Sequence, residues 1–260
     1  MKFTSVLKWE LRNIVRFPII ELLILLLTYQ VMSSAFVSAR TQDLGYNPLA
    51  ALPQGQMLTA LFTVVAQGLA GAFISISFIG AVAATMLFAY EFETGLTKFY
   101  MSLPIKRTQQ FLAKLLSCFL VPFLMLLAVG CIAEIFLNPV SVQYFFSAPE
   151  TLANVMLLLG EMALFIVAVC ITISIFSHNT AISFIGSLAI LYGLQLIGNR
   201  AFPVLPPTSL DTGLIWYLFQ PSYWNQYPGW HGTAILIVTP ILSATLLIVS
   251  YSYYCRRLNV

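Results

Sequence analysis

Long apolar runs alternate with short polar stretches along this 260-residue chain. A run of about 20 apolar residues is long enough to cross a lipid bilayer as an α-helix. The polar breaks divide the chain into six such runs, numbered here as spans one to six: 17–37, 66–90, 115–137, 152–177, 181–197 and 233–254. The pattern therefore predicts an all-α membrane protein with six transmembrane helices.

The first 16 residues follow a different, helical pattern. Apolar side chains share one side of the predicted helix and bases the other, and this predicts an amphipathic helix (1–16) at the membrane interface, with its bases toward anionic headgroups. The apolar side holds Phe3, Val6, Leu7, Leu11, Ile14 and Val15, and the basic side holds Lys2, Lys8, Arg12 and Arg16. Glu10 falls on the apolar side and is the exception. A solvated basic tail is the alternative, but it would not need this periodicity.

Composition supports lipid as the main solvent. The chain is 60% hydrophobic and only 8% charged, whereas about 25% of the residues in soluble proteins are charged. A chain so poor in charge could not cover a globule with polar surface, which excludes a soluble domain. The bases lie beside the spans rather than in a patch of their own, so we expect no nucleic-acid partner.

Lysine and arginine residues indicate the orientation. An excess of bases on the cytoplasmic side is typical of membrane proteins, and it predicts a multi-pass protein of the cell membrane with both termini cytoplasmic. With six spans, the inner side receives Lys2, Lys8, Arg12, Arg16, Lys98, Lys106, Arg107, Lys114, Arg256 and Arg257, and the outer side receives Arg40 and Arg200.

The connection 198–232 between spans five and six is long and holds five prolines and eight aromatic residues. Its apolar core, LDTGLIWYLF, is too short to cross a bilayer. Two compatible interpretations remain: a short re-entrant or interfacial helix at the outer leaflet, or an aromatic belt that anchors the last spans.

Charge is concentrated between spans two and three, so this stretch must emerge into the cytoplasm. The stretch contains Glu91, Glu93, Lys98, Lys106 and Arg107, and an apolar stripe at helical spacing formed by Leu96, Phe99, Tyr100 and Leu103. A helix of one or two turns is not stable in water alone. Either the membrane surface or another protein must therefore receive the stripe.

These residues carry a family resemblance. Glu91, Glu93 and Gly95, followed by the striped helix, Leu103-Pro104 and the bases Lys106 and Arg107, resemble the type-2 ATP-binding-cassette (ABC) transporter permeases. The amphipathic "elbow" helix, the six spans, the inner termini and the long loop before span six extend the resemblance along the whole chain. It implies a six-span permease domain over 17–260, with a cytoplasmic coupling segment at 91–107.

The resemblance also implies how the protein works. A coupling helix at about 92–103 would seat in a groove of a separate ATPase, and the active unit would be an exporter of two permease chains, identical or related, with two ATPase chains. The implied ATPase-coupling residues are Glu91, Glu93, Gly95, Leu96, Phe99, Tyr100, Leu103 and Pro104. ATP and Mg²⁺ would bind the partner ATPase, because the P-loop pattern G-x-x-x-x-G-K-[ST] does not occur in this sequence. We therefore expect no cofactor and no catalytic activity on this chain.

Acidic residues inside the apolar runs leave one alternative open. Glu134 and Glu161 are costly to bury in lipid as ionised groups, and they could relay protons in a proton-coupled secondary transporter. Glu161 lies deep in span four and either lines a pathway or makes a structural hydrogen bond. Such transporters often show internal repeats, which we do not find between the two halves. Cys118, Cys131, Cys170 and Cys255 form no CxxC or Cys/His cluster, so no metal site is expected.

Overall fold

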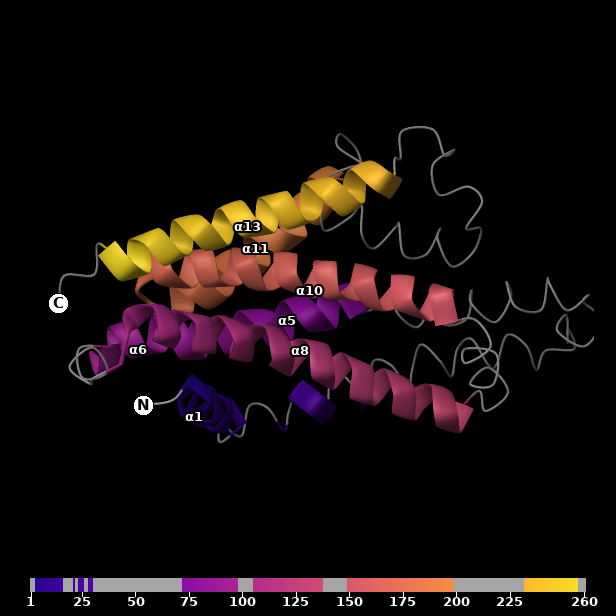
Figure 1. Cartoon of the computed structure of the whole chain (residues 1–260), viewed down its shortest axis with the longest axis horizontal. Coiled ribbons are helices and arrows are strands. Elements are labelled where there is room, and N and C mark those ends of the chain that lie inside the picture. Colours follow the sequence, from indigo (N-terminus) through magenta and orange to yellow (C-terminus); the bar gives the residue numbers. More distant parts are fainter. Residues whose placement is uncertain are drawn as a thin grey trace, which may run out of the picture.

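A computed structural model of the chain describes residues 3–15, 21, 23–25, 28, 29, 72–97, 105–137, 149–198 and 232–256. Within these ranges, all regular secondary structure is helical, in agreement with the predicted all-α fold. The elements are α1 (Phe3–Val15), α5 (Ala72–Ala84), the π-helix η1 (Thr85–Ala89), α6 (Tyr90–Glu93), α8 (Arg107–Leu137), α10 (Pro149–Ser177), α11 (Thr180–Gly198) and α13 (Gly232–Arg256) (Figure 1).

Five helices in the described part of the chain are long and apolar enough to cross a membrane: Phe73–Glu93, Arg107–Ala128, Met156–Ser177, Thr180–Ile197 and Ile235–Arg256. They correspond to predicted spans two to six. Predicted span one lies mostly outside the described residues, as do most of the 198–232 loop and the second half of the proposed coupling helix. The predicted amphipathic helix is present as α1.

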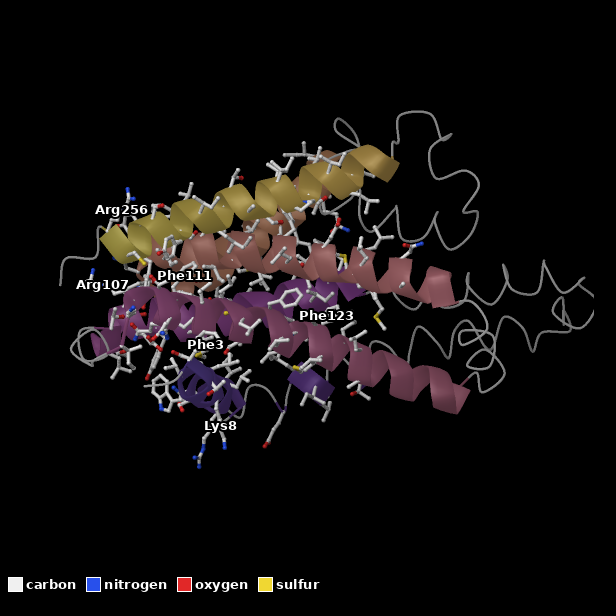
Figure 2. All side chains as sticks on the ribbon, viewed as in Figure 1. Phe3, Lys8, Arg107, Phe111, Phe123 and Arg256 are labelled. Atoms are coloured by element: carbon white, nitrogen blue, oxygen red, sulfur yellow. The ribbon has the colours of Figure 1, made fainter. Side chains whose placement is uncertain are left out.

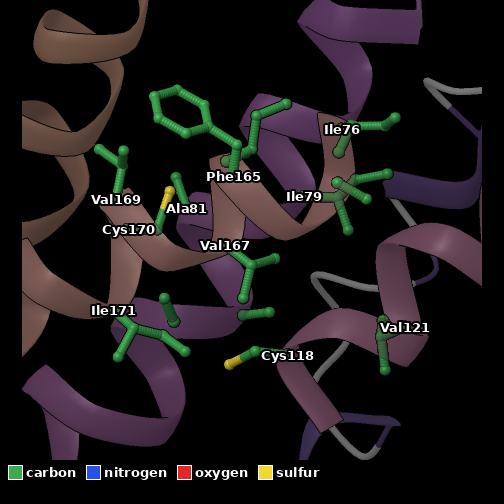
Figure 3. Close-up of a cluster of buried hydrophobic side chains, with 14 of the residues drawn as sticks. Ile76, Ile79, Ala81, Cys118, Val121, Phe165, Val167, Val169, Cys170 and Ile171 are labelled. Carbon is green, nitrogen blue, oxygen red and sulfur yellow. The ribbon is translucent and has the colours of Figure 1, made fainter. Parts of the chain in front are cut away.

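Helix α10 occupies the centre of the bundle and contacts α5, α8, α11 and α13. Its buried side chains Phe165, Val167 and Cys170 pack with residues of α5 and α8 in one apolar cluster (Figure 3). Helices α5 and α10 approach closely at Gly80, where an added Cβ would lie 3.3 Å from Ile166 Cγ2. This packing fixes span two against the central helix.

Helix α8 begins eight residues before the predicted start of span three. The hydropathy pattern marks where lipid begins, but the helix continues beyond that point because its polar first turn has partners on α13. Arg107 donates a hydrogen bond from Nη1 to the carbonyl oxygen of Cys255 at 3.2 Å. The hydroxyls of Thr108 and Tyr251 lie 3.1 Å apart. The helix then continues through Pro122.

Helix α1, the last turn of α6, the start of α8 and the end of α13 lie at the same end of the bundle (Figure 1). Figure 2 shows Lys8 pointing away from the bundle at this end, and Arg107 and Arg256 lie at the same end, on other sides of the bundle. We call this the basic end. The end of span two, described next, is at this end.

Candidate functional site

The helix of span two ends at a glycine. Thr94 donates its backbone N–H to the carbonyl of Tyr90, Gly95 donates its own to the carbonyl of Phe92, and Gly95 has a φ of 74°. A glycine in the left-handed conformation is a common helix terminator, because residues with a Cβ are strained there. Helical geometry resumes at Leu96 and Thr97, and Leu96, the first residue of the predicted stripe, is exposed.

This break corrects one boundary. We expected the coupling helix to start at about residue 92, but Phe92 and Glu93 belong to α6, the last turn of span two. Any separate coupling helix therefore starts after Gly95. Since the helix of span two continues through both acids, it also fixes the directions in which Glu91 and Glu93 point.

Glu91 and Glu93 project to opposite sides of α6. Each residue advances an α-helix by about 100°, so two residues at i and i+2 lie about 200° apart. Glu91 is 6% exposed and faces α8, whereas Glu93 is exposed and faces the start of α11. The two acids therefore anchor the end of span two on two different sides.

Glu91 forms part of a buried ion cluster centred on Lys114, which is 0% exposed. Lys114 Nζ lies 2.5 Å from Glu91 Oε1, and 3.2 and 3.3 Å from the two carboxylate oxygens of Glu10 on α1. The buried partner of Glu91 is thus a lysine of span three. Lys114, one of the bases that the sequence analysis assigned to the inner side, is fully buried within the bundle.

The same ammonium group contacts the π-helix of span two. Lys114 Nζ donates a hydrogen bond to the carbonyl oxygen of Leu87 in η1 at 3.0 Å and lies 5.9 Å from the centre of the Phe88 ring. A π-helix inside a longer α-helix is uncommon and is found frequently at functional sites. Here the π-helix lies immediately before the turn that carries Glu91 and Glu93.

Glu10 explains the exception in the amphipathic pattern of α1. It is fully buried against α8, beside Val6 and Ile14 on the same helical side. Burial raises the pKa of the Glu10 carboxyl above its ordinary value, although the charge of Lys114 acts in the opposite direction. An acid on the apolar side of an interfacial helix is therefore a buried partner for a base on another element.

Glu93 caps the start of α11. Its Oε2 accepts the backbone N–H of Thr180 at 2.9 Å, and the side chain of Asn179 accepts the N–H of Ile182 at 3.0 Å. The first N–H groups of a helix have no partner within the helix, so acceptors are favourable there, and acidic ones especially. The turn before α11 contains His178 in a left-handed conformation with φ of 52°, and its ring lies 4.7 Å from that of Phe92.

Aromatic packing fills the space between these polar anchors. The rings of Phe88, Phe111 and Tyr254 lie 5.6 to 6.0 Å from one another, and they come from η1, α8 and α13. Farther into the bundle, the hydroxyl of Thr85 lies 2.9 Å from that of Ser183, which lies 2.6 Å from that of Ser174. The end of span two is therefore fixed to α1, α8, α10, α11 and α13.

The remaining candidate residues are placed as follows. Glu161 lies on α10, half-buried, and its Oε2 has no hydrogen-bond partner among the described residues. Glu134 belongs to α8, beyond the residues whose side chains the structure describes. Phe99, Tyr100, Leu103 and Pro104 lie outside the described residues.

The site residues that the sequence interpretation missed are Glu10 and Lys114. Lys114 could have been found, because the buried apolar residues Phe111, Cys118 and Val121 lie at i−3, i+4 and i+7 from it, on the same side of the helix.

The left-handed conformation of Gly95 makes a direct prediction. Gly95→Ala should destabilise the protein by about 1–2 kcal/mol, because the strain lies in the backbone and no atom of the described residues lies within 4 Å of the added Cβ. Gly95→Asn should cost less, since asparagine enters this conformation more readily. Thermal unfolding of both purified variants checks this, and an alanine variant as stable as wild type would contradict it.

Comparison with known families agrees with these features. A family model described as "ABC-2 family transporter protein" matches residues 4–252. The match covers nearly the whole chain, so this protein belongs to the ABC-2 transporter family, whose members are the membrane subunits of ABC transporters. No curated protein and no solved structure matches the chain. Family membership confirms the resemblance drawn from the sequence and does not favour a proton-coupled secondary transporter.

Proposed function

We propose that this chain is the membrane-spanning permease subunit of an ABC exporter of the cell membrane, driven by ATP hydrolysis on a separate ATPase. The observation that carries the proposal is the anchored end of span two. The acids of the Glu-x-Glu-x-Gly sequence hold this end on two sides, Glu91 through Lys114 and Glu93 through α11. A displacement of the segment that follows Gly95 would therefore be transmitted to the other helices of the bundle.

The proposed coupling segment is 91–107, with two sets of residues in different roles. Glu91, Glu93 and Gly95 set the position and direction of the segment. Leu96, Phe99, Tyr100 and Leu103 form the apolar stripe that enters an ATPase groove, and Pro104 ends the helix. ATP and Mg²⁺ bind the ATPase and not this chain.

A second permease copy completes the proposed assembly, as a homodimer or with a related permease. Helix α11 supports this, because much of its apolar surface is not covered by the rest of the described chain. The exposed large residues on it are Ile182, Ile185, Ile190, Leu196 and Ile197. Spans one and five are proposed to lie near the dimer axis, and the remaining surface faces lipid.

Purification from the native membrane tests the proposal. A tagged copy of the full chain, extracted in a mild detergent, should bring down a P-loop ATPase in about equal amount, and mass spectrometry of every co-purifying chain identifies it. An unrelated tagged membrane protein from the same membrane serves as the control. Recovery of the permease without any ATPase would argue against an ABC transporter subunit.

The proposed orientation is tested by cysteine labelling in a variant without the four native cysteines. Thr208→Cys lies in the proposed outer loop, and Ser5→Cys lies on the exposed side of α1 at the basic end. An impermeant thiol reagent should label position 208 in intact cells and position 5 only after permeabilisation. Labelling of position 5 in intact cells would reverse the orientation.

A further inference from the structure

Lys114 joins α1 to the end of span two, two parts of the chain that are far apart in the sequence. Its ammonium group has three donor hydrogens, and three acceptors surround it: Glu10 of α1, Leu87 of η1 and Glu91 of α6. Lys114 itself belongs to α8. Figure 1 shows α1 beside the start of α8, at the end of the bundle where α6 ends. The ion cluster of Glu10, Glu91 and Lys114 is thus the point where α1 meets span two.

Stability alone does not explain a buried ion cluster. Replacing such a cluster by uncharged residues of similar volume is often neutral or stabilising, because the charges are costly to remove from water. Charged groups do fix the relative position of the elements that carry them, since each donor has a defined acceptor, whereas apolar side chains slide past one another more easily. Fixing the register of packed helices is the best-attested role of buried polar groups.

We propose that Lys114 and Glu10 are positioning residues of the coupling segment, which brace the end of span two against α1 and α8. Through this brace, α1, α6 and the start of α8 move as one body when the coupling segment is displaced. The amphipathic helix is then a working part of the coupling site and not only a membrane anchor. The consequence for ATP hydrolysis rests on the proposed function, but the brace is a property of this chain alone.

Two variants separate positioning from mere stability. The neutral variant Glu10→Gln/Glu91→Gln/Lys114→Met removes all three charges and leaves two amides that can bond each other and the Leu87 carbonyl. The swapped variant Glu10→Lys/Lys114→Glu keeps the net charge and places one lysine, now on α1, between two carboxylates, the new one on α8 and that of Glu91 on α6. If the ion cluster acts as a brace, the position of α1 relative to span two should be loosely defined in the neutral variant. It should be well defined again in the swapped variant.

The first measurement uses spin labels on the permease alone. One pair, at Ser5 of α1 and Tyr90 of α6, reports the brace, and a reference pair, at Leu124 of α8 and Leu157 of α10, reports the rest of the bundle; all four residues are exposed. We expect a narrow Ser5–Tyr90 distance distribution in wild type and the swapped variant, and a broad one in the neutral variant, with the reference pair unchanged. A narrow distribution in the neutral variant would overturn the proposal.

The second measurement uses the complex with its ATPase. The neutral variant should retain the wild-type ATPase-to-permease ratio and the KM for ATP. It should lose about tenfold in the stimulation of ATP hydrolysis by the permease, within the range of coupling free energies between distant sites. The swapped variant should recover most of this loss. Wild-type stimulation in the neutral variant would overturn the proposed role.

The proposal can be tested even if the neutral variant does not fold. If the reference pair shows that the neutral variant is misfolded, the swapped variant decides, and a broad Ser5–Tyr90 distribution there overturns the brace. If wild type recovers no ATPase, the proposed function fails, whereas the spin-label measurement still decides whether the ion cluster holds α1 to span two.

Discussion

Lys114→Met alone is expected to destabilise the protein by about 3–5 kcal/mol, the usual cost of removing one partner from a buried ion pair. The substitution leaves the carboxylates of Glu10 and Glu91 buried without their cation, and the Leu87 carbonyl loses a hydrogen bond. The volume of the side chain changes little, so a packing defect does not explain the loss. Thermal unfolding of the purified permease in detergent measures the effect.

Lys106→Met is the matched control. It makes the same chemical change eight residues earlier, at an exposed position, where substitutions usually change stability by less than about 0.5 kcal/mol. Adding Glu10→Gln and Glu91→Gln to Lys114→Met should restore most of the stability, because the uncompensated charge is then gone. Equal unfolding temperatures for Lys106→Met and Lys114→Met would contradict this prediction, because they would show that the two carboxylates do not need the lysine as a buried partner.

The spans were predictable because lipid constrains the sequence strongly. Every backbone polar group in a bilayer must find a partner within the protein, so apolar runs of sufficient length form helices. This constraint acts on the segments inside the bilayer and not on the helix ends outside it. The start of α8 was therefore missed, since Arg107 and Thr108 extend the helix through contacts with α13 that no local pattern contains.

The roles of Glu91 and Glu93 were predictable only in part. Their place at the end of span two followed from the charge pattern, but the prediction that span two ended at about residue 90 put both acids in the cytoplasm. The structure places the helix end after Glu93, and the i, i+2 spacing then sends Glu91 inward and Glu93 toward α11. A difference of one helical turn in the boundary thus decides which acid is buried.

The ion cluster itself depends on contacts over long sequence distances. Glu10 and Lys114 are separated by 104 positions, and neither a motif nor a spacing rule connects them. A signal was nevertheless present, because each is a charge on the apolar side of its own helix, and the two charges have opposite sign. Two such exceptions in one sequence favour each other as partners, since a buried charge is costly without one.

Phe99→Ala with Tyr100→Ala is expected to lower the affinity of the permease for its ATPase by a factor of about 30 or more. Both residues lie outside the described part of the chain, and the prediction depends on the stripe that starts at the exposed Leu96. Aromatic anchors in buried interface pockets typically cost about 2 kcal/mol or more on truncation. The ATPase-to-permease ratio after purification measures the loss, and the amount of inserted permease should not change.

Met101→Ala is the control for this double variant, because helical spacing places Met101, also a large apolar residue, off the stripe. It should leave the ATPase ratio near the wild-type value. Glu93→Gln should also retain more ATPase than the double variant, since the contact of Glu93 in the described part of the chain is with the start of α11. A wild-type ratio in Phe99→Ala/Tyr100→Ala would mean that the stripe contacts lipid. The ATPase would then have to contact the permease at some other surface.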